Sequence, residues 1–574
     1  MEIPGDGDYV DLVTFAFSGP TDYDRNQPLY IDAEDPSCAL TADEFRFLVR
    51  SLIAGFKACG LERGDCVLVH IPNTIIYPAL FLSIIGAGAI FAGSNPASQT
   101  YELDHYLELS KPKLIITSPE ALQTVLDASS TKEINPGQVL VLDTPVIRRM
   151  VQSLPRDWAR FTLETRRRDA STPLSLPELL SHGESEWLKF ESGTNLSKTT
   201  PVAMYLTSGT TGLPKAAVHS HHSTIAAHLC VQFTVPYKSV RLLCLPLFYR
   251  FGAHWQIHPI RYGEPMYVLP RFDPILFTEA VRRNHITETY VVPTMIHILN
   301  RDAVSPVHQL DGVGSLPSMR HVGVAGAAID AASIKRFQNF LGPQAAVWQI
   351  WGMTETGAAF TNRFGEGKYP DSIGKLTQLY EARLINLDNK DVIHQDDSPG
   401  ELEVRGPGTV LEYRYPTQQP QEGSIKDGQG WFKTGDIAYV KDGYYFMVGR
   451  TKEMIKVYGY HVAPAEIESV LLKHSGIEDA AVIGVPLEGS NTEVPRAFVV
   501  RSDNANEKPI LTAEEVDIFV RKHLVSYKAL DGGVIFVSKI PRTVTGKIFR
   551  RKLTDMNAYR DRLSSFLGKR NGSS

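Results

Sequence analysis

The chain has 574 residues, of which 43% are hydrophobic and 21% are charged. These proportions are normal for a globular protein, and the length allows roughly two to four domains with a sizeable core. The formal net charge of −5 gives no overall basic field, which argues against nucleic acid as the main partner.

Targeting and crosslinking signals are absent from the sequence. Five scattered cysteines with no Cys-x-x-Cys pair argue against a disulfide framework and against a zinc site. Residues 1–11 are acidic and lack the basic-then-apolar order of a secretory signal, so we expect a cytoplasmic protein. The longest uncharged apolar run, residues 77–93, contains Pro78 and three glycines. It falls short of the ~20 residues that a spanning helix needs, and it predicts a buried helix that runs into a strand.

From residue 40 the pattern alternates between helix and strand. Thr41 can cap a helix that extends to about residue 59, because Phe45, Leu48, Leu52 and Phe56 recur at helical spacing. Aliphatic or β-branched runs predict strands at residues 66–71, 114–117, 139–142, 242–245, 266–269, 289–292 and 322–325. Strands that alternate with helices predict largely parallel sheets covered on both faces. Residues 152–200 are polar and weakly periodic, which predicts a surface excursion.

The predicted secondary structure changes after residue 388, where short, turn-rich strands predict a small β subdomain. A boundary candidate follows at residues 449–452, and beyond it helices and strands alternate again in a unit of roughly 120 residues. The fold class expected is therefore α/β. A large N-terminal domain of parallel, αβ-layered sheets with a small β subdomain would occupy residues 1–448, and a small α+β domain residues 449–574.

A glycine-rich segment carries the strongest chemical signal. The apolar residues 202–206 end in Thr207, and the next residues are Ser208, Gly209, Thr210, Thr211 and Gly212, closed by Pro214 and Lys215. Glycines let backbone N–H groups converge on an anion, hydroxyls add donors, and one lysine adds positive charge. The spacing is not that of a Walker loop. The segment indicates a phosphate loop, with an ordinary flexible turn as the alternative.

Three further stretches carry chemically useful residues. Trp351, Thr354 and Glu355 offer an aromatic face for a base, a hydroxyl donor and a carboxylate for Mg²⁺, although Trp351 alone could equally be core. Asp436 follows a glycine turn and could accept hydrogen bonds from two ribose hydroxyls, or could be an ordinary exposed turn residue. Lys547 ends a proline-to-glycine loop and, taken singly, could be an exposed surface charge.

Together, and in this order, these stretches resemble the motifs of the adenylate-forming enzymes. That superfamily comprises acyl-CoA synthetases, adenylation domains of nonribosomal peptide synthetases and beetle luciferases. The resemblance extends from about Asp35 to Leu553 and is closest to stand-alone acyl-CoA ligases of the hydroxycinnamate:CoA ligase type. It implies that Mg·ATP activates a carboxylic acid to an acyl-AMP with release of pyrophosphate, and that the acyl group then passes to CoA.

The resemblance also implies roles for individual residues. The loop from Thr207 to Lys215 would hold the β- and γ-phosphates, and Trp351, where the family more often has tyrosine, would lie against adenine. Lys547 would bridge the substrate carboxylate and the α-phosphate, and rotation about Lys452 would then replace it with the segment that begins at Lys456. The expected catalytic residues are Lys547, Lys456, Thr354 and Glu355, and Glu355 is also the expected Mg²⁺ ligand. The expected nucleotide site comprises Thr207, Ser208, Gly209, Thr210, Thr211, Gly212, Lys215, Ala327, Gln349, Trp351, Gly352, Thr354, Asp436, Arg450 and Lys547.

The acyl pocket of such enzymes would lie between residues 245–254 and the strand ends at residues 324–328 and 351–353. Small side chains there suggest a roomy apolar pocket for an aromatic or medium-chain acid. Arg250 would either pair with a polar group of the substrate or point outward. The expected pocket residues are Tyr249, where many relatives have histidine, Phe251, Val324, Ala325, Gly326 and Met353.

Three other functions remain open at this level. The acceptor could be a carrier-protein thiol or an amine supplied in trans, since no carrier site follows Lys547. Luciferase-like oxygenation is more remote. A catalytically dead nucleotide-binding or acyl-binding protein is disfavoured, because an inactive site would be expected to have lost some of its functional residues. All of them are present here: Lys215, Thr354, Glu355, Asp436, Arg450 and Lys547.

Overall fold

The computed structural model describes residues 10–20, 22–130, 132, 134–154, 172–191, 194–207, 214–231, 235–301, 315–327, 329, 331–366, 368–415, 425–458, 460–487, 490, 492–502, 511–542 and 547–558. Six residues of the predicted phosphate loop lie outside the described residues, namely Ser208, Gly209, Thr210, Thr211, Gly212 and Leu213. Thr207 and Lys215, which flank them, are described.

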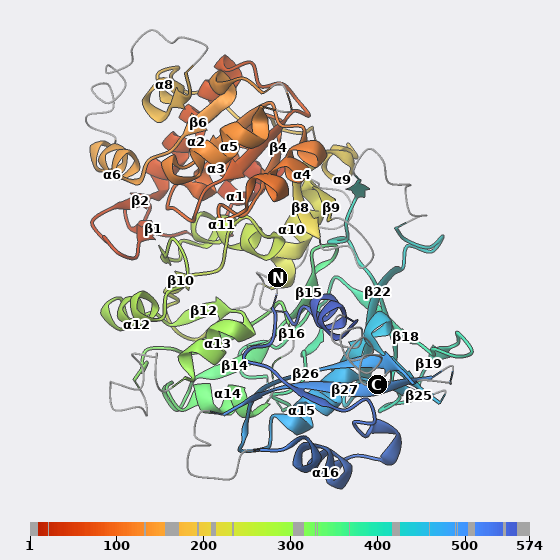
Figure 1. Ribbon diagram of the computed structural model, residues 1–574. Helices are drawn as coiled ribbons and strands as arrows, with labels where there is room; N and C mark the ends of the chain where they lie inside the picture. The colour runs from red at the N-terminus through yellow and green to blue at the C-terminus, as the bar shows by residue number, and fades with distance from the viewer. Residues whose placement is uncertain are drawn as a thin grey trace, which may run out of the picture.

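An eight-stranded sheet forms the upper part of the molecule in Figure 1. Its order is β21-β9-β8-β4-β3-β5-β6-β7, and it is parallel except where β9 pairs with β8 and with β21. The strands are β3 (Cys66–His70), β4 (Ile90–Gly93), β5 (Leu114–Thr117), β6 (Val139–Val141), β7 (Leu174–Ser175), β8 (Pro201–Thr207), β9 (Lys215–Ser220) and β21 (Glu412–Arg414).

Helices cover both faces of this sheet, as the sequence predicts. The helices α2 (Ala42–Ala58) and α3 (Tyr77–Gly86) share one core with the sheet, and α4 (Thr100–Ser110) and α5 (Leu122–Ser129) share another. Thr41 forms a capping box with Glu44 at the start of α2. Every residue of α3 is buried, and β4 follows it, so the expected buried helix and strand are confirmed. The remaining helices are α6 (Thr144–Ser153), α8 (Leu176–Leu180) and α9 (Leu196–Thr199).

The prediction of a surface excursion over residues 152–200 is wrong for residues 174–180, whereas most of residues 181–191 are exposed as expected. Leu174 of β7 pairs with Leu140 at the edge of the eight-stranded sheet. Leu179 and Leu180 of α8 are fully buried, and α8 packs against α2. The short strand and the helical turn were not predicted, because the sequence there is weakly periodic and their burial depends on elements distant in sequence.

A seven-stranded sheet lies below the first; in Figure 1 its strands β10 to β14 are in the green part, and β1 and β2 are red. Its order is β14-β13-β12-β10-β11-β1-β2, and only β1 and β2 run antiparallel. The strands are β1 (Pro28–Asp32), β2 (Ala39–Thr41), β10 (Arg241–Leu243), β11 (Met266–Val268), β12 (Glu288–Val291), β13 (His321–Val324) and β14 (Ala346–Gln349). The associated helices are α1 (Leu12–Phe17), α10 (His221–Cys230), α11 (Arg250–Tyr262), α12 (Pro274–Arg283), α13 (Pro293–Leu299) and α14 (Ala331–Gln338).

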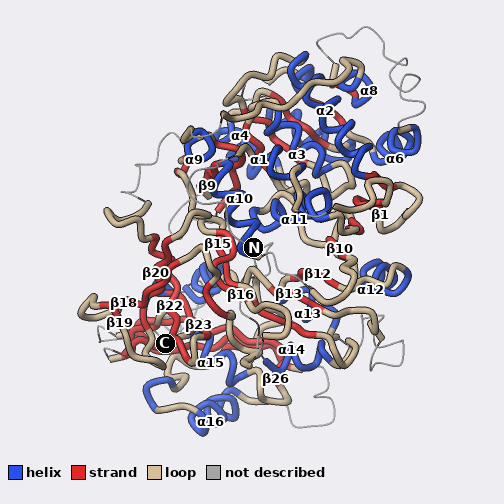
Figure 2. Tube along the Cα trace, turned by 180° about the vertical axis from the view of Figure 1, so that it is seen from behind, coloured by secondary structure: helices blue, strands red, loops and turns tan. Residues whose placement is uncertain are grey.

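Two smaller sheets follow along the chain. One comprises β15 (Trp351–Met353), β16 (Gly357–Thr361) and β17 (Lys375–Leu376), and the other has the order β19-β18-β20-β22-β23. The latter is the expected β subdomain, and it contains β18 (Glu381–Ile385), β19 (Val392–Ile393), β20 (Gly400–Arg405), β22 (Phe432–Lys441) and β23 (Tyr444–Arg450). Figure 2 shows β15 and β16 near the centre of the molecule, below α10.

The C-terminal unit, blue in Figure 1, has its own apolar cores. It contains β24 (Ile455–Val457), β25 (Tyr460–Val462), α15 (Pro464–Leu471), β26 (Ile477–Pro486), β27 (Glu493–Arg501), α16 (Ala513–His523) and β28 (Val534–Phe536). The fold is thus a large layered αβ unit with a small β subdomain, followed by a separate small unit.

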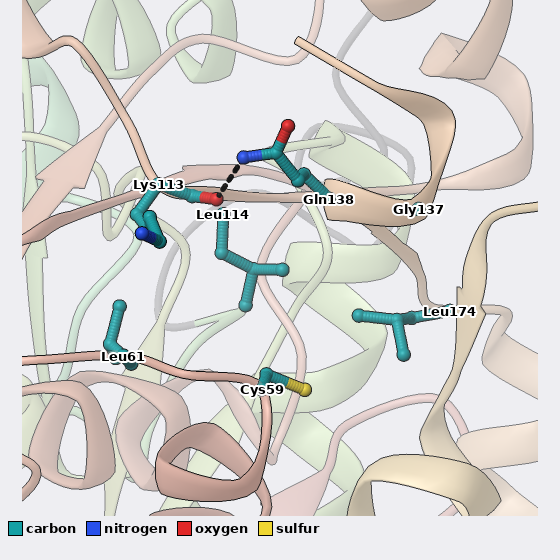
Figure 3. A pocket seen from close by; sticks show the side chains of 7 residues that line it. All are labelled: Cys59, Leu61, Lys113, Leu114, Gly137, Gln138 and Leu174. Atoms are coloured by element: carbon teal, nitrogen blue, oxygen red, sulfur yellow. Dashed lines mark hydrogen bonds between the residues drawn. The ribbon is translucent and has the colours of Figure 1, made fainter. Parts of the chain in front are cut away.

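A small cavity near the end of α2 is shown in Figure 3, where Gln138 donates a hydrogen bond to the carbonyl of Lys113. Its volume is about 60 Å³, and Cys59, Leu114 and Leu174 contribute to its walls. That space is enough for a few waters and too small for an acyl group. None of the predicted site residues lines it.

Candidate active site

A tryptophan, a carboxylate and an arginine meet where β15, β22 and β23 come together. Asp436 is opposite Arg450 in the β22–β23 ladder, and the two side chains form an ion pair with Nε 2.9 Å from Oδ1. The indole N–H of Trp351 donates to Oδ2 over 2.9 Å. Asp436 is only 4% exposed, so the interpretation as an exposed turn residue is wrong. Burial raises the pKa of this carboxyl group, and Arg450 and Trp351 oppose that rise.

Glu355 is a buried carboxylate held by two hydroxyl donors. Thr207, the last residue of β8, donates to Oε1 over 2.8 Å, and Tyr413 of β21 donates to the same oxygen over 3.2 Å. Carboxylate oxygens are ligands that Mg²⁺ prefers, usually one or two of them together with phosphate and water. Glu355 therefore fits the metal role. In the described part of the chain, no group of three or more His, Cys, Asp or Glu residues is arranged to hold a metal by itself.

Thr354 is positioned by a buried histidine that the sequence motifs did not reveal. His219 lies near the end of β9, just before α10 begins. Its Nε2 donates to the carbonyl of Thr354 over 2.8 Å. Burial, and then the charge of Arg250, hold the pKa of His219 well below its ordinary value, so the ring is neutral. The Thr354 side chain itself is half-buried. The only available signal was the position of His219 in the strand that follows the glycine-rich segment.

The two ends of the glycine-rich segment are fixed side by side. Thr207 and Lys215 are partners across the β8–β9 ladder. The ammonium group of Lys215 lies 3.7 Å from the centre of the Tyr413 ring and 5.5 Å from that of Tyr415, which are cation–π distances. Tyr413 therefore contacts both Lys215 and Glu355, and sequence reasoning missed it. The alternation of aromatic residues at 413 and 415 was the only signal for it.

Lys547 comes from the C-terminal unit and joins this group of residues. Its side chain is accessible to solvent but lies among charged groups of the large unit. Partial loss of water lowers its pKa, Arg450 lowers it further, and the carboxylates of Asp436, Glu355 and Glu453 oppose the decrease. The structure therefore brings Lys547 close to Asp436 and Glu355. Lys547 is exposed, as the alternative of a surface charge expected, but charged groups of the large unit act on it.

The other predicted lysines lie elsewhere. Lys452 is exposed directly after β23, and Lys456 is exposed in β24. Backbone groups of Lys456 bond to Glu493 and Thr492.

The remaining predicted nucleotide residues are Gln349, Gly352 and Ala327. Gln349 is buried at the end of β14 and donates to the carbonyl of Asp371 over 3.1 Å. Gly352 lies on β15, where an added Cβ would be 2.5 Å from the carbonyl oxygen of Gly357, so no larger residue fits. Ala327 is partly exposed after β13.

The predicted acyl residues gather at the start of α11 and the ends of β13 and β15. Tyr249 precedes α11, and the Phe251 ring lies 5.9 Å from that of Tyr290. Arg250 is 7% exposed and donates to the carbonyl of Ser223, so the outward-pointing alternative is wrong. Val324 and Ala325 are buried, and Gly326, with φ of 93°, and Met353 reach solvent.

A buried asparagine that was not predicted holds the turn before Tyr249. The side-chain amide of Asn73 donates to the carbonyls of Leu245 and Leu269 over 2.9 and 3.2 Å, and its oxygen accepts from the N–H of Leu247 over 2.9 Å. Asn73 also contributes to the wall of a cavity of about 170 Å³ beside Asp32 and Arg148. It joins the end of β3 to the acyl side of the site.

Comparison with known proteins shows the family of the chain. The sequence model described as AMP-binding enzyme matches residues 22–414, and that described as AMP-binding enzyme C-terminal domain matches residues 466–547. The chain belongs to the AMP-binding enzyme family. Nicotinic acid-CoA ligase pyr1 of Aspergillus fumigatus, a relative of this chain, is 48% identical to it over 97% of this chain and 98% of its own length. Phenylacetyl-CoA ligase epaB of Aspergillus niger is 38% identical over 95% and 97%.

Solved structures show the same fold. The anthranilate CoA ligase AuaEII in complex with anthranoyl-AMP has a TM-score of 0.78 at 21% identity, covering 98% of this chain and 100% of that one. ATP-bound MatB from Rhodopseudomonas palustris has a TM-score of 0.77 at 22% identity, covering 95% and 99%. This AMP-binding enzyme is an acid–thiol ligase that uses ATP, Mg²⁺ and CoA, forming an acyl-AMP and then an acyl-CoA. Within the described residues, no helix has the length and apolar character needed to cross a membrane.

Proposed function

We propose that this ligase activates a carboxylic acid with a single aromatic or heteroaromatic ring, nicotinic acid being the first candidate. The observation that carries the proposal is the aromatic packing on the acyl side. Trp255 of α11 and Tyr290 of β12 have ring centres 4.1 Å apart, and Phe251 lies beside them. A flat ring suits such surroundings. We therefore favour a ring acid over the medium-chain alternative.

The names of related proteins support the same substrate class. The pyr1 ligase and the olcI ligase of Penicillium canescens are both 48% identical to this chain and are named nicotinic acid-CoA ligases. The epaB relative at 38% is named for phenylacetyl-CoA. All three names refer to acids with one aromatic ring.

In the first step, Lys547 would offset negative charge where the carboxylate meets the α-phosphate. A carboxylate is a poor nucleophile near a polyanion, so positioning and positive charge lower the barrier most. Thr354 would donate to the α-phosphate, and the segment between Thr207 and Lys215 would hold the β- and γ-phosphates. Glu355 would bind Mg²⁺, which neutralises phosphate charge.

The nucleoside would be held at the junction of β15, β22 and β23. Trp351 would pack against adenine while its N–H fixes Asp436. Because Oδ1 of Asp436 has an ion-pair contact but no hydrogen bond with good geometry, it retains acceptor capacity for ribose hydroxyls. Arg450 would keep that carboxylate ionised.

In the second step, the C-terminal domain would turn to present another face. We place the domains at residues 1–448 and 449–574 and the hinge at Lys452, which is exposed directly after β23. Rotation there would withdraw Lys547 and bring the exposed Lys456 hairpin to the acyl-AMP. Such hinge closure assembles one site at a time.

A panel of acids tests the substrate class. The protein would be incubated with Mg·ATP, CoA and nicotinate, benzoate, phenylacetate, hexanoate or palmitate, and AMP and acyl-CoA would be quantified by mass spectrometry. The proposal expects acyl-CoA and equimolar AMP with ring acids. Preference for hexanoate or palmitate would contradict it. Acyl-AMP that accumulates without use of CoA would favour a carrier protein or amine acceptor.

The wider cellular setting also remains a proposal. We infer a cytoplasmic enzyme whose partners are the acid, ATP and CoA rather than nucleic acid. The net charge of −5 supports the last point, because polyanions bind basic surfaces.

A further inference from the structure

The interface between α10 and α11 contains buried polar groups that lack hydrogen-bond partners. His228 of α10 is 1% exposed, and neither of its ring nitrogens has a partner with hydrogen-bond geometry. His254 of α11 is 8% exposed, and its Nδ1 is likewise unpaired. The two ring centres are 4.5 Å apart. Buried polar groups are normally paired, so an unpaired pair of histidines inside one helix interface requires an explanation.

Both histidines are neutral at physiological pH. Burial holds the pKa of His228 and of His254 well below the ordinary value, and neighbouring histidines and arginines lower both further. A neutral imidazole has one N–H donor and one acceptor nitrogen. Each ring can therefore donate a hydrogen bond to a neutral acceptor without placing a charge in the interior.

This interface adjoins the reacting centre. Ala227, next to His228, lies 2.8 Å from where a Cβ on Gly357 would be, and Gly357 directly follows the Thr354–Thr356 turn. At the first turn of α11, Arg250 reaches across to the carbonyl of Ser223 on α10. Figure 1 shows α10 and α11 together at the centre of the molecule.

Arg250 and His254 lie one turn apart on α11. Arg250 is a buried cation, and no carboxylate in the described part of the chain forms an ion pair with it, so an anionic group is favoured beside it. His254 lies four residues further along, a rise of about 6 Å. If the ring of the acid extends along α11 from the reacting centre, its far side would lie near His254.

We propose that His254, supported by His228, recognises a hydrogen-bond acceptor in the ring of the acid, such as a pyridine nitrogen. This inference rests on the proposed function, because it needs a ring acid in the site. A hydrocarbon ring would leave the histidines buried and unpaired, and sites built to hydrogen-bond a substrate select strongly against analogues that lack the bonding atom. His254 is thus a specificity-determining residue.

Nicotinate and benzoate form the test pair, because they differ by one ring atom. We expect the wild-type enzyme to favour nicotinate by at least about tenfold in kcat/KM. His254→Leu is expected to bring the ratio of the two kcat/KM values close to one, mainly through loss of nicotinate turnover. His254→Asn, whose amide can place a donor near the position of Nδ1, is expected to retain part of the preference. A ratio measured within one variant cancels general damage to the protein.

His258→Gln is the matched control. His258 is buried one turn further along α11. Its Nδ1 also lacks a partner, but its Nε2 bonds to Glu264 over 2.8 Å, so its loss should lower stability without changing the ratio. The inference is overturned if wild type uses both acids equally, if His254→Leu keeps the preference, or if His258→Gln changes the ratio as much. Absence of turnover with both acids in wild type would instead refute the proposed function itself.

Discussion

The indole N–H of Trp351 donates a hydrogen bond to Asp436, and this 2.9 Å contact joins the central strand β15 to the β subdomain. It links the residue expected to face adenine with the carboxylate expected to hold ribose. Because Asp436 is buried, each donor that it retains favours its ionised form. If these two residues hold the nucleotide as proposed, the contact would couple the position of the nucleotide to the charge of Asp436.

Trp351→Phe should weaken ATP use and move its pH dependence. The substitution keeps an aromatic face but removes the N–H, and hydrogen bonds to charged groups contribute about 1.5–3 kcal/mol, so kcat/KM for ATP should fall at least about tenfold. Trp351 lowers the pKa of Asp436, which burial has raised. Activity that needs the carboxylate is lost as pH falls through that pKa, so the acidic limb should move to higher pH in the variant.

The pH profile of kcat/KM for ATP measures this effect, and Trp348→Phe is the control. Trp348 lies on neighbouring β14, and its Nε1 has no hydrogen-bond partner. An identical acidic limb in wild type and Trp351→Phe would show that the indole N–H does not act on Asp436.

Lys547→Ala should separate the two half-reactions. Removal of the cation should reduce acid adenylation by at least about 100-fold, whereas thioester formation from supplied acyl-AMP and CoA should remain within about threefold of wild type, because Lys547 is expected to leave before that step. Each half-reaction is measured alone by rapid quench. Lys552→Ala, which changes an exposed lysine nearby, should affect neither, and equal loss of both steps in Lys547→Ala would refute the assigned roles.

Glu355→Gln should increase the Mg²⁺ concentration that adenylation requires. The amide keeps the shape of the side chain but loses the charge, so the half-saturating Mg²⁺ concentration should increase at least about tenfold. A Mg²⁺ titration of acid-dependent pyrophosphate release checks this. Glu412→Gln alters an exposed carboxylate on β21 and should give the wild-type curve; a wild-type curve for Glu355→Gln would exclude Glu355 as the metal ligand.

Asn73→Leu should destabilise the large domain by about 2–3 kcal/mol, because it leaves the buried N–H of Leu247 unpaired. Urea unfolding measures the change, and Asn26→Leu in an exposed turn should stay within about 0.5 kcal/mol of wild type. Since Asn73 fixes the turn before Tyr249, KM for the acid should also rise. Unchanged stability would mean that the turn does not depend on this amide.

Much of the fold could be predicted because its signals are local. The buried helix and strand of residues 77–93 are visible in an unbroken apolar run, and Thr41 with Glu44 marks the start of α2. The strand and helix at residues 174–180 were missed because their burial depends on pairing with β6 and packing on α2.

The candidate site shows the same division. The sequence motifs pointed to residues such as Trp351, Glu355 and Asp436. They did not point to His219, Tyr413 or Asn73, because each of these acts through a contact between elements far apart in sequence. The burial of Arg250 could not be predicted either. Its position at the start of α11 does not show which neighbouring helix it faces until the fold brings α10 beside it.

Acid-dependent exchange of labelled pyrophosphate into ATP tests the central claim most directly, because it requires reversible formation of an acyl-AMP. With Mg²⁺, ATP and nicotinate but no CoA, we expect exchange that depends on the acid. On addition of CoA, we expect acyl-CoA and AMP to form in equal amounts. Absence of exchange with nicotinate, benzoate and phenylacetate, together with exchange driven by an aliphatic acid, would contradict the claim that this ligase activates a ring acid.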